Sequence, residues 1–123
     1  MDSKTLATMC RTLADNKKAE DLVVLDVNKI SSITDYFVIA SGTSEPHLRA
    51  IAEEITETLK TEHGVSPRAQ DGTLQTGWLV IDFFDVIVHV MRKEVRDRYD
   101  LESLWGDAPR LRIAKPRKKA AAQ

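Results

Sequence analysis

Two aspartates and one histidine, Asp82, Asp85 and His89, lie close together in the most apolar part of the sequence. Carboxylate and imidazole groups bind metal ions and take part in hydrolytic reactions. The apolar runs 78–81 and 86–91 around them predict two buried strands of a hairpin. In that hairpin Asp82 and His89 share one face, whereas Asp85 lies in the turn. Because two ligands without a third make a weak site, we expect no metal. We expect Asp85 to cap the turn and His89 to be hydrogen-bonded or to face a partner.

A second candidate is the segment Ser41-Gly42-Thr43-Ser44, which joins a predicted strand to a predicted helix. Free amides and the dipole at a helix N-terminus favour an anion at such a junction. Nucleotidyltransferases combine a similar Gly-Ser junction with an Asp-x-Asp pair that holds two metal ions. The sequence has no Asp-x-Asp pair. It therefore favours an anchored turn, and a phosphoryl-transfer enzyme using Ser44 and Asp82 is the alternative function.

Cys10 is the only cysteine, which excludes an internal disulfide and a thiolate metal cage. It shares a helical stripe with Leu6, Met9 and Leu13, so we predict that it fills the core. Nucleophilic catalysis needs a histidine and an orienting acid beside the nucleophile. The sequence places neither beside Cys10 or any serine, and we predict no catalytic residue and no cofactor.

The predicted hairpin has two unlike faces. With its turn at 84–85, residue 81 pairs with 88 and residue 79 with 90. One face is then entirely apolar and consists of Leu79, Ile81, Phe83, Val86, Val88 and Val90. The other face carries Trp78, Val80, Asp82, Ile87, His89 and Met91. A large aromatic, a thioether and a histidine on one face suit contact with a partner as well as an interior.

The elements around the hairpin define the fold class. Ordered along the chain, we predict a helix over 3–16 capped by Ser3, strands over 22–27 and 36–40, a helix from its cap Ser44 to Gly64, and a short strand between 66 and 76. After the hairpin, Asp100 is predicted to cap a short helix with Leu101, Leu104 and Trp105 on one face. Such a short helix must dock on the sheet or on another molecule. The order predicts a single-domain α/β sandwich on a mixed sheet of four or five strands.

The charges are unevenly distributed. Residues 110–123 carry six cations and no acid, which leaves 12 basic and 19 acidic residues in 1–109, a net charge of −7. An acidic body is a poor general binder of nucleic acid. The basic tail either contacts phosphate or is a solvated, disordered terminus. No apolar run approaches the roughly 20 residues that cross a bilayer, and no signal-peptide pattern opens the chain, so we expect a cytoplasmic protein without membrane contact.

Five motifs follow one another along the chain: Ser-Ile-Thr-Asp-Tyr-Phe-Val-Ile-Ala-Ser-Gly-Thr-Ser at 32–44, Asp71-Gly72, Gly77-Trp78, Asp-Val-Ile-Val-His-Val at 85–90 and Tyr-Asp-Leu-Glu-Ser-Leu-Trp at 99–105. In this order they resemble the ribosomal silencing factor (Iojap) family, over a match from about Leu6 to Leu111. Two positions depart from the family pattern. Asp71 replaces the usual Glu, and Phe84 replaces a common Gly in the hairpin turn, where a side chain resists positive φ.

The resemblance implies a nucleotidyltransferase-like fold without catalysis. It also implies binding to the large ribosomal subunit through ribosomal protein fourteen of that subunit, which sterically blocks subunit joining and represses translation when nutrients are scarce. Family members further suggest a homodimer. We expect residues 1–109 to form this domain and 110–123 to be the basic tail; an adaptor that binds RNA through the tail is a third alternative. The residues to which we assign partner binding are Trp78, His89, Met91, Tyr99, Asp100, Leu101, Leu104 and Trp105.

Overall fold

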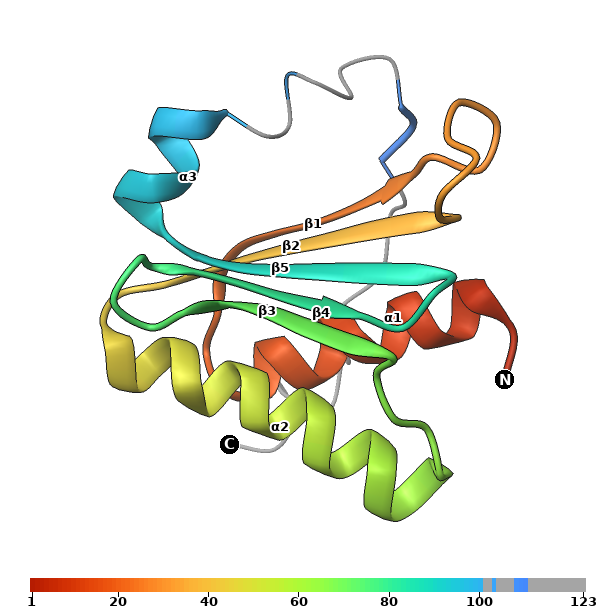
Figure 1. The fold of residues 1–123 in the computed structure, drawn as a ribbon, viewed down its shortest axis with the longest axis horizontal. Coiled ribbons are helices and arrows are strands. Elements are labelled where there is room, and N and C mark those ends of the chain that lie inside the picture. Colours follow the sequence, from red (N-terminus) through yellow and green to blue (C-terminus); the bar gives the residue numbers. More distant parts are fainter. Residues whose placement is uncertain (101–102, 104–107, 111–123) are drawn as a thin grey trace, which may run out of the picture.

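A computed structural model of the chain describes residues 1–100, 103 and 108–110. Five strands form one mixed sheet in the order β1-β2-β5-β4-β3 (Figure 1). The neighbours β2 and β5 are parallel and the other neighbours are antiparallel. The strands are β1 Glu20–Asp26, β2 Tyr36–Gly42, β3 Ala69–Thr73, β4 Trp78–Asp82 and β5 Val86–Arg92. The predicted α/β fold on a mixed sheet is confirmed, with five strands.

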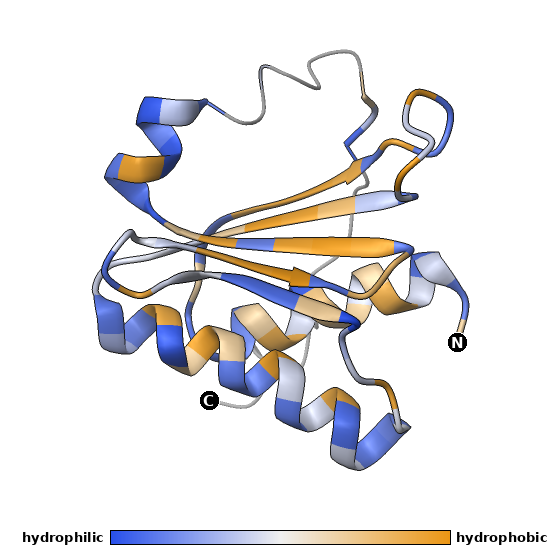
Figure 2. Ribbon diagram, in the orientation of Figure 1, coloured by the Kyte–Doolittle hydropathy of each residue, from blue (hydrophilic) through white to orange (hydrophobic). Residues whose placement is uncertain are grey.

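Helices cover the two faces of this sheet unequally. The helices α1, Ser3–Asn16, and α2, Glu45–His63, pack on one face, and the short α3, Lys93–Tyr99, lies on the other (Figure 1). The larger hydrophobic core lies between the sheet and α1 and α2. A smaller core lies on the α3 side. Figure 2 shows hydrophobic residues along β1, β2, β4 and β5, whereas β3 is mostly hydrophilic, and all five of its residues are exposed.

The helix boundaries follow local capping chemistry. Ser44 accepts a hydrogen bond from the His47 amide and Gly64 adopts the left-handed conformation, so the predicted start and end of α2 are confirmed. The predicted cap of α1 is wrong by one residue. Asp2, rather than Ser3, accepts from the Thr5 amide at 2.7 Å. Cys10 is fully buried as predicted, and burial raises the pKa of its thiol to about 12.

The hairpin pairs as the sequence predicts. Ile81 lies opposite Val88, and the amide of Phe83 donates to the carbonyl of Val86 at 2.8 Å. The turn is made despite its side chain: Phe84 has φ 79. The Asp82 carboxylate accepts from the Phe84 amide, and the Arg68 guanidinium lies 4.7 Å from the centre of the Phe84 ring. These contacts hold a residue that resists this conformation.

The Phe84 turn allows a direct measurement of backbone strain. Phe84→Gly and Phe84→Ala both remove the ring contact with Arg68, but only glycine adopts positive φ without a steric penalty. We therefore expect Phe84→Gly to be more stable than Phe84→Ala by about 1 kcal/mol in urea denaturation. An alanine variant as stable as the glycine variant would show that the turn changes its conformation when the ring is removed.

The helix α3 corrects the sequence analysis, which left 93–99 without an element. Its only buried residues are Val95 and Arg96, so it has no apolar stripe, and no side chain caps its N-terminus. Asp100 is the C-terminal cap of α3 and has the left-handed conformation, with φ 45. The sequence had predicted for it only the N-terminal cap of a helix that follows. The carboxylate of Asp100 does accept from the Ser103 hydroxyl, three residues on. The other predicted members of that helix, Leu101, Leu104 and Trp105, lie outside the described residues.

Candidate functional site

Four rings form a cluster on the α3 side of the sheet. Trp78 begins β4, His89 lies in β5, Phe37 lies in β2 and Tyr99 ends α3. The indole N–H of Trp78 donates to Nδ1 of His89 at 3.0 Å. The ring centroids of Trp78 and Tyr99 are 5.1 Å apart, and those of Phe37 and His89 are 5.4 Å apart at an edge-to-face angle of 60°. The cluster therefore runs from the middle of the sheet to the surface.

Burial divides this cluster into an inner and an outer part. Tyr99 is 55% exposed and Trp78 is half-buried, whereas His89 is only 8% exposed and Met91 is fully buried. Direct contact with a partner is therefore open to Trp78 and Tyr99, and to the exposed Asp100. Met91 offers no surface in this structure. The position assigned to Met91 is therefore a supporting one beneath the cluster.

The ionisation state of His89 follows from its surroundings. Burial lowers the pKa of its imidazole from 6.5 to about 4, because an apolar environment disfavours the charged form. The ring is therefore neutral at pH 7. Because Nδ1 accepts the indole hydrogen, the single ring proton is on Nε2. This corresponds to the hydrogen-bonded histidine that the sequence analysis gave as one of two alternatives.

Two half-buried aliphatic residues extend the face beyond the rings. Val80 lies opposite His89 on the neighbouring strand, and Ile87 lies beside Phe37. Both belong to the mixed face predicted for the hairpin, but neither is among the predicted binding residues. We define the open face as Trp78, Val80, Ile87 and Tyr99.

Close backbone packing sets the position of Trp78. Gly77, just before it, has φ 75, and its carbonyl accepts from the Arg92 amide at 2.8 Å. A Cβ atom at Gly77 would lie 3.1 Å from a methyl carbon of Val95 and 3.2 Å from the Arg92 side chain. Glycine therefore lets the start of β4 lie directly against the start of α3. The aromatic cluster depends on this approach.

Arg96, which is not among the predicted site residues, connects α3 to the sheet. Its guanidinium is buried, with 6% of the residue exposed, and donates to the Ser41 hydroxyl at 2.8 Å. A charged side chain is seldom buried without such partners. An arginine within the polar segment 93–99 carries no sequence signal of this role, because the same pattern is typical of a solvated helix.

The junction at 41–44 is an anchored turn, as predicted. Nδ1 of His47 accepts from the Thr43 amide at 2.9 Å, and Nε2 of the same ring bonds the Lys17 carbonyl at 2.8 Å. The Ser44 hydroxyl caps α2. The amides of Thr43 and His47 are thus already bonded within the chain and are not available to an anion.

The carboxylates of the alternative enzyme lie elsewhere. Asp82 pairs with Arg68 at 3.2 Å, and Asp85 is exposed in the hairpin turn. In register, Asp82 lies beside Ile87, whereas the end of β2 before Ser44 lies beside Arg92. Five residues of strand separate the two, about 17 Å. Within the described part of the chain, no three metal-ligating side chains lie together.

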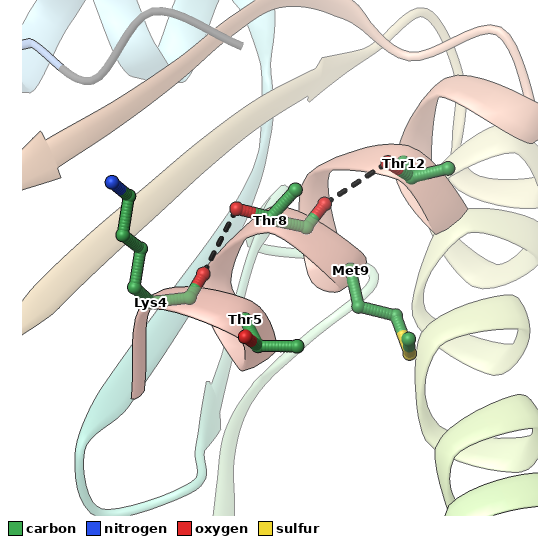
Figure 3. Close-up of a pocket in the computed structure, with 5 residues that line it drawn as sticks. All are labelled: Lys4, Thr5, Thr8, Met9 and Thr12. Carbon is green, nitrogen blue, oxygen red and sulfur yellow. Dashed lines mark hydrogen bonds between the residues drawn. The ribbon is translucent and has the colours of Figure 1, made fainter. Parts of the chain in front are cut away.

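A groove of about 350 Å³ runs along α1, on the opposite side of the sheet from the open face (Figures 1 and 3). It is lined by Lys4, Thr5, Thr8, Met9 and Thr12. The hydroxyls of Thr8 and Thr12 donate to carbonyls one helical turn earlier, so they are already used. No predicted site residue lines this groove.

In the described part of the chain, no helix has the length and apolar character to span a membrane.

The fold and the ring cluster define a small α/β protein in which two long helices pack on one face of the sheet and, among the described residues, only the short α3 lies on the other. The chain belongs to the ribosomal silencing factor family: the model of the family described as "Ribosomal silencing factor during starvation" matches residues 1–123. It is 39% identical over 109 residues to "Ribosomal silencing factor RsfS" of Bacillus subtilis, covering 89% of this chain and 92% of that protein.

Two further relatives extend the comparison. A crystal structure of a protein from Chromobacterium violaceum superposes with a TM-score of 0.82 at 31% identity, covering 94% of this chain and 95% of that chain. A mouse protein named "Mitochondrial assembly of ribosomal large subunit protein 1" is 35% identical over 99 residues, which are 79% of this chain and 43% of that protein. The family resemblance found in the sequence is thereby confirmed.

Proposed function

We propose that the protein is a ribosomal silencing factor that binds the large ribosomal subunit through ribosomal protein fourteen of that subunit. Bound there, it blocks joining of the small subunit by steric exclusion and represses translation. Family membership supports the role, and the name of the mouse relative supports the large subunit as the partner. The observation that carries the proposal is the open face, where Trp78 and Tyr99 meet solvent.

The open face has the composition of a binding surface. Large aromatic residues are enriched at the centres of interfaces, where each buries a large area with few rotatable bonds. Val80 and Ile87 extend this apolar area across β4 and β5. On the opposite face of the sheet, α1 and α2 already cover the residues of the hairpin. A partner that covers the open face would complete the burial that α3 begins.

The first test is sedimentation with purified ribosomal particles. We expect the protein to co-sediment with isolated large subunits, to remain unbound with small subunits, and to lower the yield of joined ribosomes in proportion to its occupancy. The warrant against indiscriminate binding is the net charge of −7 in residues 1–109, which repels RNA. Equal binding to small subunits, or unimpaired joining at saturating protein, would overturn the proposal.

We also infer that the protein is not an enzyme. Ser44 is engaged in capping and Asp82 in an ion pair at the opposite end of the sheet, so the pair required by the alternative is not assembled. Calorimetric titration with magnesium, manganese and nucleoside triphosphates should give no specific heat. Micromolar binding that disappears in Asp82→Ala, but not in the neighbouring turn variant Asp85→Ala, would restore the enzyme hypothesis.

The proposal also covers the binding domain, the basic tail and the oligomeric state. We take residues 1–109 as the binding domain and 110–123 as a basic tail, whose cations would contact ribosomal RNA. Arg110, the first residue of that tail, forms a β-bridge with Leu25, while 111–123 lie outside the described residues. A homodimer of the free protein is the third part. Analytical ultracentrifugation across a concentration range would measure it, and a single monomeric species at high concentration would exclude it.

A further inference from the structure

We infer that His89 is a positioning residue: it does not meet the partner itself, but fixes the indole of Trp78 in the orientation that the partner binds. The inference rests on the proposed function and adds to it a division of roles within the ring cluster. Trp78 is the contact residue, and His89 beneath it is the fixed acceptor that determines where the indole points.

The contact between the two rings is specific in geometry. Trp78 lies directly opposite Met91 in the antiparallel pair, so His89 is its diagonal neighbour on the same face of the sheet. The indole leans along the strands to bring Nε1 within 3.0 Å of Nδ1 of His89. Their centroids are 5.9 Å apart at 50°, so the rings meet through this hydrogen bond rather than by stacking. The N–H of a half-buried indole needs a hydrogen-bond acceptor, and Nδ1 of His89 is that acceptor.

The acceptor is itself held in place. His89 lies in β5, between β2 and β4, and its ring meets the edge of Phe37. With only 8% of the residue exposed, the imidazole has little room to change rotamer. The lowered pKa of His89 keeps Nδ1 unprotonated and able to accept at neutral pH. On the solvent side, the ring of Tyr99 packs against the indole, with the two ring centroids 5.1 Å apart.

A positioned indole has a physical advantage for binding. A half-buried tryptophan without a fixed partner samples several rotamers, and binding must then select one at a cost in affinity. A hydrogen bond to a buried, immobile acceptor removes that cost before the partner arrives. An apolar residue at position 89 would fill the same space without this direction, since it cannot accept a hydrogen bond.

The test compares His89→Phe, which keeps a ring but has no acceptor, with His89→Gln, which keeps an acceptor. Each is made in ¹⁵N-labelled protein, in which the indole N–H signal of Trp78 is identified as the one that Trp78→Phe removes. We expect His89→Phe to stay folded, to shift the indole signal and speed its exchange with water, and to weaken large-subunit binding by about fivefold. His89→Gln should return both readouts towards those of the parent.

Each other outcome has a definite meaning. If His89→Phe moves the indole signal but binds large subunits like the parent, indole orientation is irrelevant and the inference is wrong. If either folded variant loses binding with an unchanged indole signal, His89 acts by another route and the inference is also wrong. If His89→Phe does not fold, His89→Leu, which also has no acceptor, replaces it in the same two readouts, with His89→Gln again as the control. A parent that binds no large subunits overturns the proposed function instead, while the indole signals still report whether His89 orients Trp78.

Discussion

Substituting alanine for Trp78 should weaken binding to the large ribosomal subunit by about tenfold or more, a loss of about 1.4 kcal/mol at least. The indole is the largest side chain on the open face and is already oriented by His89 and Tyr99. Truncating such an aromatic at the centre of an interface typically costs about 2 kcal/mol or more. Affinity is measured by sedimentation or surface-based binding with purified large subunits.

Two controls separate this loss from trivial causes. Because Trp78 also packs on the smaller core, the melting temperature of Trp78→Ala must be measured with its affinity. Truncation after Leu111 removes five of the six tail cations, which should change affinity only a few-fold and mainly alter its salt dependence. If Trp78→Ala binds normally while the truncation abolishes binding, the open face is not the interface and the tail is the anchor.

The hairpin and α2 were predictable because local chemistry and burial agree there. The helix α2 has a serine cap, a glycine stop and an apolar stripe, three independent signals for one element. The hairpin register followed from the turn at 84–85 together with alternation, since a shift by one residue would exchange the two faces. Even Phe84, which resists the turn, did not change the register. Its conformational penalty is small beside the burial of Ile81 and Val88 on the larger core.

The helix α3 was not predictable for the opposite reason. Its sequence is charged, its N-terminus lacks a cap, and its stability comes from tertiary contacts made by Val95 and Arg96. A hydrogen bond between residues 41 and 96 is a product of the fold, with no counterpart in local sequence. Asp100 was likewise noted as a capping residue, but the same residue type also tolerates the left-handed conformation that ends a helix.

The sequence predicts which residues of the candidate site share a face of the sheet, but not how deeply each is buried. Alternation along β4 and β5 placed Trp78, His89 and Met91 together, and the structure confirms that they lie on the α3 side. Alternation says nothing about how far α3 covers that side. In the structure Met91 is buried and Val80 is half-buried. Met91, a predicted binding residue, therefore adds no surface, whereas Val80, which was not predicted to bind, does. The interface roles themselves remain predictions.

The second large predicted effect is the pH dependence of the free energy of unfolding. Folding lowers the pKa of His89 from 6.5 to about 4, so between these values the unfolded chain binds the proton and the native protein does not. The free energy of unfolding is therefore fully retained above pH 6.5 and falls as the pH is lowered towards 4. At about 1.4 kcal/mol for each pH unit, the total loss is about 3 kcal/mol. This is a large share of the 5–15 kcal/mol or so that stabilises a typical domain.

Urea denaturation at intervals from pH 7 to pH 4.5 measures this dependence, and His89→Phe isolates it. The variant has no proton to bind at this position in either state, so its stability should fall less steeply over the same range. His63→Gln is the matched control: it removes a histidine from the exposed end of α2, far from the rings, and should keep the parent profile. A His89→Phe profile parallel to that of the parent would mean that the imidazole is hydrated in solution. The acceptor beneath Trp78 would then be less firmly buried than the structure indicates.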